Sequence, residues 1–396
     1  MKPWIKKAHA YIAQKTKRNL TQIGSQFPHA TKNGRYDVCE PQWWTAGFWP
    51  GILWNAYLDT NEEEYKILAT TLEKEMDVLL TNPNTVDHDI GFMWTLTSLA
   101  RYEITGNQDA CQTALQAANM LLARYNSLGH YFKAWNNWHG TDDNSGIVII
   151  DSMMNMGLLF WAAEETRDPR FKIAAMGHSD MILQEFVRPD GSVHQMVDFD
   201  SATGEVKEKR GGQGFAEDSS WSRGCGWAIY GLAIAYHYTK EDRYLEGAMK
   251  VCNHFALHLG ADALPLWDFR IPENTETIKY DYRDSSASAV AACGALLIGK
   301  YAQHHEGNFY AAFGEELLRR LYESSAATTT ADFEGLLKDG TSHWPEQKYL
   351  HEALIYGDYF FTEGIYALSG IDNTFWLGKK LTANSSKPEE SLGAVR

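Results

Sequence analysis

Gly146-Ile-Val-Ile-Ile-Asp-Ser-Met-Met-Asn155 places one carboxylate, Asp151, between an apolar run and the start of a predicted helix. An Asp at this point either caps the helix, by accepting hydrogen bonds from its first free amides, or carries out chemistry. The stretch His88-Asp89-Ile-Gly-Phe-Met-Trp94 has the same design one helix pair earlier. Two acids at equivalent points of a repeated unit can face each other. The repeat therefore favours a catalytic role, with which capping remains compatible.

The repeated unit is a helical hairpin, and its polar turn recurs six times. Apolar periodicity predicts helices almost throughout, joined in pairs by turns such as Asp59-Thr-Asn61 and Thr105-Gly-Asn107. An apolar helix precedes each turn; the six are predicted at residues 47–58, 90–104, 152–165, 221–238, 285–303 and 359–368. Amphipathic helices follow the first five turns, and an N-terminal helix at about residues 4–20 completes the sixth pair. Twelve helices in six hairpins predict an all-α (α/α)6 barrel.

Composition limits the class of protein. The chain has 396 residues, 44% of them hydrophobic, and no Pro/Gly/Ser-rich linker, which predicts one domain over residues 1–380 and a flexible tail over 381–396. The formal charge of -15 argues against nucleic acid as a partner, because phosphates require a basic face. Five scattered cysteines without CxxC spacing predict reduced thiols and no metal site. Monomer and homodimer both stay open.

The sequence also bears on location. The first residues, Met1-Lys-Pro-Trp-Ile-Lys-Lys, lack the apolar core of a signal peptide. No later stretch reaches the roughly 18 apolar residues that a membrane span needs. We therefore expect a cytoplasmic protein without membrane contact, or a periplasmic one if a leader has been removed.

A closed barrel brings distant motifs together, because its six inner helices run in the same direction and their N-termini share one mouth. The mouth residues are Trp43-Trp44, His88-Asp89, Asp151, Trp221-Ser-Arg223, Arg283-Asp284-Ser-Ser286 and Gly357-Asp358. Helix N-termini add positive potential suited to an anionic ligand. The long links near residues 126–146, 188–220, 259–284 and 326–357 emerge at the same mouth and are predicted to form its walls. Within the second, residues 192–198 alternate like a strand, and Thr203-Gly204 indicates its turn.

Motifs along nearly the whole chain match one family. They include Trp44-Thr-Ala-Gly-Phe-Trp-Pro-Gly, His88-Asp-Ile-Gly-Phe92 and Trp221-Ser-Arg-Gly-Cys-Gly-Trp227, with further matches at residues 134–135, 149–151, 211–213, 267–269, 282–288 and 356–359. In this order and spacing they resemble glycoside hydrolase family 88, the unsaturated glucuronyl hydrolases. The resemblance implies the same barrel and an unusual reaction. Water adds across the C4=C5 double bond of the terminal unsaturated uronic acid that a polysaccharide lyase leaves, and the resulting hemiketal opens and releases the next sugar.

The resemblance also implies residue roles. Asp151 would be the general acid and base, and Asp89 the partner that holds the substrate and tunes Asp151. The implied substrate-binding residues are Trp44, Trp135 and Trp227, which would stack on sugar rings, together with His88, His194, Gln213, Arg223 and Lys348. His88 has an alternative role in orienting Asp89. The expected partner is an oligosaccharide that ends in an unsaturated uronic acid, and no metal or organic cofactor is implied.

The proposed acid must hold a proton near neutral pH. The pKa of Asp151 would have to rise about 2 to 3 units above 3.9, which corresponds to about 3 to 4 kcal/mol. A helix N-terminus opposes this rise by roughly 0.3 to 1 kcal/mol. Apolar neighbours such as Ile150 and Met153, and the like charge of Asp89, must therefore dominate. Arg223 can grip a substrate carboxylate through two parallel hydrogen bonds, or pair with a buried Asp instead.

Other interpretations stay open. Sugar epimerases use the same barrel with histidine bases, for which only His88 and His194 stand at the mouth motifs. A non-catalytic sugar-binding barrel would need the aromatic residues but not paired acids. The related unsaturated rhamnogalacturonyl hydrolases differ in the sugar beyond the uronate. Asp284 and Asp358 are expected to be helix caps.

The last wall link bears on sulfate. Family members that favour sulfated substrates carry a Ser-x-x-Ser-x-Lys pattern there, and the matching stretch here is His343-Trp-Pro-Glu346-Gln-Lys348. Only the lysine of the pattern is present, and the carboxylate of Glu346 would repel a sulfate. We expect unsulfated disaccharides to be preferred.

Overall fold

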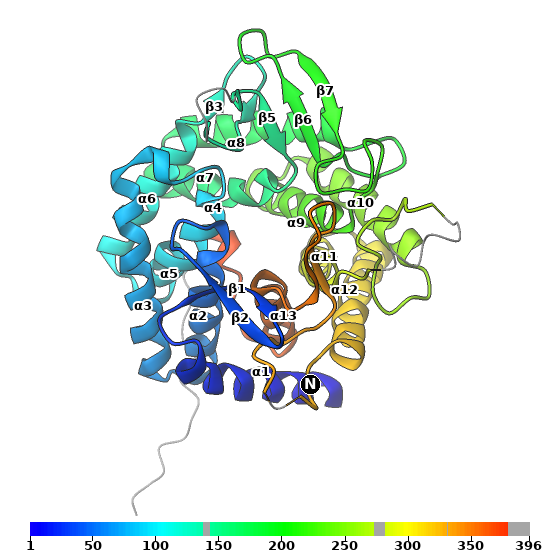
Figure 1. Cartoon of the computed structure of the whole chain (residues 1–396). Helices are drawn as coiled ribbons and strands as arrows, with labels where there is room; N and C mark the ends of the chain where they lie inside the picture. The colour runs from blue at the N-terminus through cyan, green and yellow to red at the C-terminus, as the bar shows by residue number, and fades with distance from the viewer. Residues whose placement is uncertain (138–142, 273–281, 331, 379–396) are drawn as a thin grey trace, which may run out of the picture.

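Two concentric rings of helices build the molecule, and the computed structural model describes residues 1–137, 143–272, 282–330 and 332–378. Twelve helices in these ranges form the predicted (α/α)6 barrel (Figure 1). The inner ring consists of α2 (Phe48–Thr60), α4 (Ile90–Trp94) continued by η4 (Thr95–Leu99) and α5 (Ala100–Thr105), α7 (Ser152–Thr166), α9 (Ser222–Thr239), α11 (Ser285–Tyr301) and α13 (Ile355–Leu368). The outer ring consists of α1 (Pro3–Gln22), α3 (Glu63–Asp77), α6 (Gln108–Leu122), α8 (Pro169–Met181), α10 (Asp242–Leu259) and α12 (His304–Ser324).

The polar turns that predicted the hairpins end one helix and start the next. Four of the six inner helices end on a residue in the left-handed conformation, such as Asn61 (φ 56°) and Gly106 (φ 70°). Asn107 then caps α6 by accepting the N–H of Ala110, and Asp168 caps α8 by accepting that of Arg170. The turns before α6 and α8 thus satisfy backbone groups at the end of one helix and at the start of the next.

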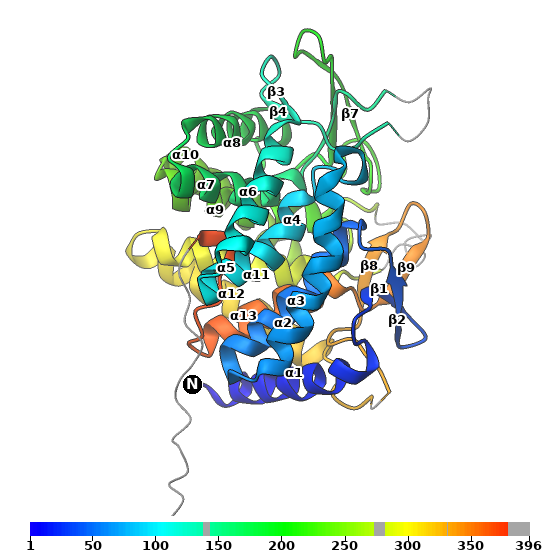
Figure 2. The ribbon, with the colours of Figure 1, turned by 90° about the vertical axis from the view of Figure 1, so that its left-hand side faces the viewer.

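Short strands and turns precede the inner helices and surround the mouth. The strands are β1 (Phe27–Lys32), β2 (Arg35–Cys39), β3 (Tyr125–Asn126), β4 (Tyr131–Phe132), β5 (Ile147–Ile149), β6 (Met196–Phe199), β7 (Val206–Arg210), β8 (Gly340–His343) and β9 (Lys348–Glu352). They pair antiparallel as β1–β2, β3–β4, β5–β6–β7 and β8–β9. Short helical turns are η1 (Trp44–Gly47), η2 (Val78–Thr81), η3 (Pro83–Thr85), η5 (Ile182–Phe186) and η7 (Phe375–Leu377). Figure 2 shows β1–β2 and β8–β9 on the same side of the barrel.

The links between the helical hairpins contain the predicted strand and turn, and a hairpin that was not predicted. The strand predicted at residues 192–198 is β6, which is shorter and shifted toward the C-terminus, and Thr203-Gly204 lies in the turn before β7 as predicted. The β1–β2 hairpin was not predicted. Parts of three predicted wall links, residues 138–142, 273–281 and 331, and the predicted tail at 381–396 lie outside the described residues.

Aromatic side chains fill the barrel axis below the mouth. Phe360 stacks on Trp376 with ring centroids 6.0 Å apart, and Trp227 meets both Phe360 and Phe92 edge to face. These rings are buried. The barrel is therefore closed by its own core, and a ligand at the mouth meets an aromatic floor. In the part of the chain that the structure describes, no helix has the length and apolar character to span a bilayer.

Candidate active site

A cavity of about 550 Å³ opens at the mouth, between the N-terminal ends of the inner helices and the hairpins β1–β2 and β8–β9. Among the residues that line it are seven of those predicted from the sequence: Trp44, Asp89, Trp135, Asp151, Gln213, Arg223 and Lys348. They come from four separate helical hairpins and three links. The cavity therefore exists only when the ring of helices is closed.

Asp151 stands at the start of α7 without capping it. Its backbone is already helical (φ -53°, ψ -29°), and its carboxylate accepts no amide of the helix. The side chain is nearly buried, with 8% exposed, and among the described residues Oδ2 has no hydrogen-bond partner. Burial raises the pKa of Asp151 to about 6, against the opposing effects of Arg223 and the Trp227 indole. The group can therefore both give and accept a proton near neutral pH.

Asp89 lies on the neighbouring inner helix and shares the cavity with Asp151. Burial raises its pKa well above the usual range, and the like charges of Asp87 and Asp151 add to this effect. The repulsion between the predicted pair thus raises the pKa of Asp89, whereas the sequence predicted that it would raise that of Asp151. Asn155 opposes the rise by donating to Asp89 Oδ1 at 3.3 Å.

Asp87 is a third acid at the cavity, and it was missed in the sequence. Its Oδ1 accepts the N–H of Asp89 at 2.9 Å, which fixes the backbone at the start of α4. Arg124 lies close enough to favour the charged forms of both Asp87 and Asp89. Its guanidinium also donates to the carbonyl oxygen of Ala134 at 3.0 Å and to Asn136 Oδ1 at 2.8 Å. Arg124 thereby fastens the link that carries Trp135. Asp87 stands two residues before Asp89, and this proximity is the only feature of the sequence that indicates a place for Asp87 at the cavity.

His88 does not reach the cavity, which corrects the prediction of a substrate contact. Its ring is fully buried, with Nε2 3.5 Å from Asp89 Oδ1, and its amide donates to the carbonyl oxygen of Ala134 at 3.0 Å. Burial holds the pKa of His88 well below its usual value, so the ring is neutral. This position agrees with the alternative role of a neighbour that orients Asp89.

His194 and Trp227 also lie outside the cavity lining, contrary to the prediction. Arg188 Nη2 lies 2.8 Å from Nδ1 of His194, and burial together with Arg188 lowers the pKa of this histidine to about 4. Trp227 is fully buried between Phe92 and Phe360, with centroids 5.2 and 5.6 Å away, so its ring faces are not open to a sugar. Its indole acts instead on the pKa of Asp151.

Arg223 combines the two roles considered for it. It lines the cavity, and its Nη1 pairs with Asp284 at 2.5 Å. Its Nη2 donates to Gln213 Oε1 at 3.2 Å and to the carbonyl oxygen of Ser342 at 2.6 Å. The guanidinium also lies over the rings of Trp221 and Tyr356, 4.6 and 5.2 Å from their centroids. Arg223 is therefore a rigidly held cation in the cavity wall.

The two predicted helix caps differ. Asp284 caps α11 by accepting the N–H of Ser286 at 3.1 Å, as predicted. Asp358 does not cap α13; it accepts the amides of Leu336 and Leu337 at 2.6 and 2.9 Å. Asp358 thus fixes the last wall link rather than the helix.

The outer part of the cavity comes from the two hairpins, and sequence reasoning missed most of it. His29 and Cys39 of β1–β2 lie there with His343 and Tyr349 of β8–β9. Burial lowers the pKa of His29 to about 4 and raises that of the Cys39 thiol to about 11, so this thiol is a poor nucleophile. The predicted Lys348 also lines this part, where its Nζ pairs with Glu346 at 2.5 Å.

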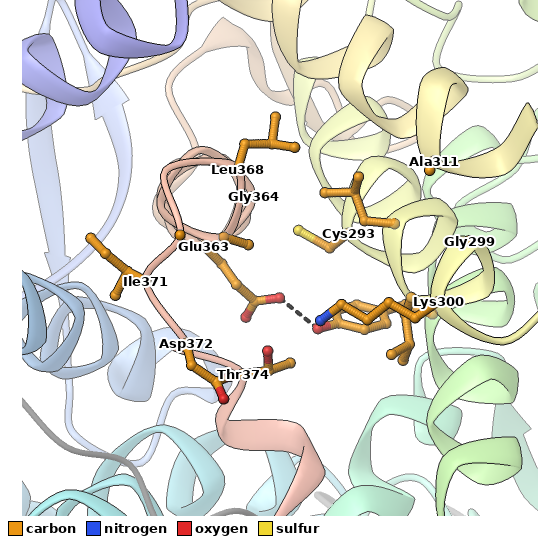
Figure 3. A pocket seen from close by; sticks show the side chains of 15 residues that line it. Cys293, Gly299, Lys300, Ala311, Glu363, Gly364, Leu368, Ile371, Asp372 and Thr374 are labelled. Carbon is orange, nitrogen blue, oxygen red and sulfur yellow. Dashed lines mark hydrogen bonds between the residues drawn. The ribbon is translucent and has the colours of Figure 1, made fainter. Parts of the chain in front are cut away.

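A second cavity, of about 430 Å³, lies at the opposite end of the barrel between α11, α13 and the segment after α13. Glu363, Lys300 and Asp372 extend toward it from different sides (Figure 3). The carboxylate of Glu363 accepts hydrogen bonds from Tyr230 Oη at 2.5 Å and from Tyr359 Oη and Trp376 Nε1, both at 2.8 Å. These bonds commit Glu363 to the packing of the closed end. We therefore place the chemistry at the mouth.

Across the described ranges, no three His, Cys, Asp or Glu side chains are grouped so that they could hold a metal ion. The three acids at the mouth, Asp87, Asp89 and Asp151, are instead embedded among amide and guanidinium donors. Neighbouring donors and charges of this kind shift the pKa values of carboxyl groups, as proton transfer requires.

Comparison with known proteins extends these observations. The sequence model of the family Glycosyl Hydrolase Family 88 matches residues 4–296 of this chain. The chain is 32% identical over 365 residues to the unsaturated glucuronyl hydrolase of Bacillus sp. (strain GL1), covering 91% of this chain and 96% of that protein. It is 30% identical over 362 residues to the unsaturated chondroitin disaccharide hydrolase of Streptococcus pyogenes serotype M1, covering 90% and 89%.

A solved structure gives the same result for the fold. The crystal structure of the unsaturated glucuronyl hydrolase from Bacillus sp. GL1, described as responsible for the degradation of glycosaminoglycan, matches with a TM-score of 0.89 at 30% identity. The match covers 95% of this chain and 99% of that one.

Proposed function

The chain belongs to glycoside hydrolase family 88, and from this premise we propose that it removes the terminal 4,5-unsaturated uronic acid from oligosaccharides that a polysaccharide lyase has produced. The observation that carries the proposal is the cavity that Asp151, with a pKa of about 6, shares with Asp89, Arg223 and three tryptophans. These groups match an anionic sugar and a reaction that begins with protonation.

The proposed reaction is a hydration. The carboxyl group of Asp151 gives its proton to C4 of the double bond, and positive charge develops at C5. The Asp151 carboxylate then takes a proton from a water molecule whose oxygen bonds to C5, so the sum of the two steps is one added water. The resulting hemiketal opens the ring and releases the next sugar. A pKa of about 6 suits both steps, since efficient acid–base groups titrate near the working pH.

Asp89 and Arg223 would position the substrate. Burial and the neighbouring acids raise the pKa of Asp89 and so favour its protonated form, which can donate a hydrogen bond to a sugar oxygen. Arg223 supplies the positive charge that an acidic chain needs in order to bind the uronate carboxylate. Trp44 and Trp135 line the same space and present flat surfaces to sugar rings.

A panel of disaccharides tests the proposal. Lyase products of hyaluronan, chondroitin, heparin, pectin and gellan-type polymers are supplied one at a time, and loss of the ultraviolet absorbance of the double bond is followed. We expect turnover of at least one unsaturated glucuronide. Turnover of the pectin product alone would instead assign the chain to rhamnogalacturonyl-type substrates. Absence of turnover across the panel would contradict the proposed function.

Hydration is separated from ordinary glycoside hydrolysis by two further measurements. An acid that protonates the bridging oxygen would cleave saturated glucuronides as well, whereas hydration needs the double bond. We therefore expect no turnover of saturated glucuronides and, in heavy water, deuterium at C4 of the product. Cleavage of saturated glucuronides at comparable rates, or a product without deuterium at C4, would show that Asp151 acts on the glycosidic oxygen.

A further inference from the structure

Asp89 occupies the N-cap position of α4, yet its carboxylate accepts no amide of that helix. An Asp at this position ordinarily turns back and accepts the N–H of the second or third helical residue. The third residue here is Phe92. A carboxylate held in that local bond would be committed to the helix and unavailable to a substrate. The cavity-facing position of Asp89 therefore requires another group to satisfy Phe92.

Asn155 satisfies it from the neighbouring helix. Its Oδ1 accepts the N–H of Phe92 at 2.7 Å, and its Nδ2 donates to Asp89 Oδ1 at 3.3 Å. Asn155 is fully buried on α7, one helical turn after Asp151. An amide carries an acceptor and a donor on one group, so asparagine makes both bonds, whereas an ionised aspartate supplies only the acceptor.

The contact also depends on Gly91, because α4 and α7 approach closely there. A Cβ at position 91 would stand 2.5 Å from the Cα of Asn155 and 2.6 Å from its Oδ1. Carbon atoms in contact lie about 3.5 to 4.0 Å apart, so any side chain would displace Asn155. Gly91 and Asn155 thus form one arrangement that joins the two helices.

We propose that Asn155 is a positioning residue that caps α4 from α7 and thereby releases Asp89 to face the cavity beside Asp151. Asn155 is not among the residues that line the cavity, so it acts through Asp89. One side chain connects the N-termini of the two helices that carry the acids. The kinetic consequences rest on the proposed function, but the geometric consequence does not depend on any substrate.

The first test is the crystal structure and the kinetics of Asn155→Ala. In the crystal we expect the Asp89 carboxylate to turn back onto the N–H of Phe92. On the best unsaturated disaccharide we expect kcat/KM to fall about a hundredfold, the usual effect of a misplaced group. In an Asp89→Asn background the same change should cost less than about threefold, because residues that act through one another are not additive.

Two further variants keep the test decisive. Gly91→Ala leaves Asn155 in the sequence but displaces it, and should turn Asp89 in the same way. Asn55→Ala is the matched control, since Asn55 is a fully buried asparagine on an inner helix, bonded to Gly51 and Asn373 away from the cavity. Asn55→Ala should lower the melting temperature, and its effect on kcat/KM should stay within about threefold and be additive with Asp89→Asn.

The outcomes separate the two proposals. If Asp89 keeps its cavity-facing position in crystals of both Asn155→Ala and Gly91→Ala, or if the losses of Asn155→Ala and Asp89→Asn multiply, Asn155 only packs the helices together and the inference is overturned. A wild-type protein without activity on any unsaturated disaccharide would contradict the proposed function instead, and the position of Asp89 in the crystal would still decide the role of Asn155.

Discussion

Asp151 and Asp89 have the same side chain and equivalent positions at helix starts, but their surroundings differ. Burial raises the pKa of both, and Arg223 limits the rise at Asp151 to about 6. At Asp89 the neighbouring Asp87 and Asp151 add to the rise. The ionised neighbours therefore favour the protonated form of Asp89, while a pKa of about 6 lets Asp151 exchange a proton near neutrality. Such a difference between two acids is what assigns their roles in acid–base catalysis.

The first prediction is that Asp151→Asn folds normally and loses about two to four decades of kcat, the usual contribution of a positioned acid or base. The rate is measured by loss of ultraviolet absorbance, and folding by circular dichroism. Glu73→Gln is the control, because Glu73 is a buried acid on α3, has a pKa raised to about 7 and lies outside the cavity lining. We expect it to keep its kcat within about threefold. A folded Asp151→Asn protein with near-full turnover would refute the assignment.

The second prediction concerns stability against pH. Because the pKa of Asp151 is raised from 3.8 to about 6 by burial, the folded state binds more protons than the unfolded state between about pH 4 and pH 6. The contribution of Asp151 to stability is therefore highest below about pH 4 and falls as pH rises through 6. Replacing it with Asn should stabilise the protein by up to about 2 to 3 kcal/mol above pH 6 and change little at pH 4.

Melting temperatures of the wild type and Asp151→Asn at pH 4, 6 and 8 measure this difference. Equal melting temperatures at pH 8 would show that the carboxylate is well solvated when ionised. That result would contradict burial as the cause of the raised pKa.

The hairpins β1–β2 and β8–β9 form one wall from opposite ends of the chain. The amide of Thr31 donates to the carbonyl oxygen of Ala353 at 2.9 Å, and Tyr349 Oη donates to Asp37 Oδ2 at 2.9 Å. The tip of the β8–β9 hairpin carries charge at the outer cavity, where Glu346 pairs with Lys348. The positive charge of Lys348 is therefore already balanced by a neighbouring carboxylate.

The third prediction is a preference for unsulfated substrates. The carboxylate of Glu346 would repel a sulfate a few ångströms away by about 4 kcal/mol at an effective dielectric of 20, and salt screening reduces this value at an exposed position. We expect the unsulfated chondroitin disaccharide to have a higher kcat/KM than its 6-sulfated counterpart. Glu346→Gln should reduce the ratio of the two kcat/KM values, unsulfated over 6-sulfated, by up to about fivefold. An interaction between two exposed charges contributes at most about 1 kcal/mol.

Glu208→Gln provides the control for this prediction, because Glu208 is an exposed acid on β7 that does not line the cavity. It should leave the ratio between the two disaccharides unchanged. Faster turnover of the 6-sulfated disaccharide by the wild type would show that Glu346 does not face the substrate.

Closure of the ring depends on the N-terminal helix. α1 packs against α2, α12 and α13, and so joins the first and last hairpins. It buries Ile5, Ala8 and Ile12. It also holds the last wall link, because Tyr11 Oη donates to the carbonyl oxygen of Leu336 at 2.7 Å and Asn19 Nδ2 to that of Glu334 at 2.9 Å. The cavity wall and the closure of the barrel therefore depend on the same helix.

The fourth prediction is that removal of residues 1–22 abolishes activity and lowers the melting temperature by at least about 10 °C, because each lost core side chain costs about 1.5 to 3 kcal/mol. Removal of Met1 and Lys2 alone is the control and should change neither the activity nor the melting temperature. Differential scanning calorimetry and the absorbance assay measure the two effects. A shortened protein that melts like the wild type would show that the ring closes without α1.

The sequence alone predicted the hairpins, the barrel and the positions of Asp151 and Asp89, because these depend on local chemistry. Apolar periodicity marks each inner helix, and turn residues such as Asn61 and Asn107 satisfy backbone groups within a few positions. A helix start is likewise visible locally. The predicted family and fold are confirmed by the family match and by the solved structure.

Only the tertiary structure decided which side chains reach the cavity. His88 and Trp227 belong to mouth motifs, yet both are fully buried: His88 lies beside Asp89, and Trp227 lies in the aromatic floor. Asp87 and His29, in contrast, line the cavity. The direction of a side chain at a helix start depends on the neighbours that compete for its polar groups. For Asp89 that neighbour is Asn155, 66 positions away in the chain. The bonds between the β1 and β9 regions join residues more than 300 positions apart, and no local pattern records such a pairing.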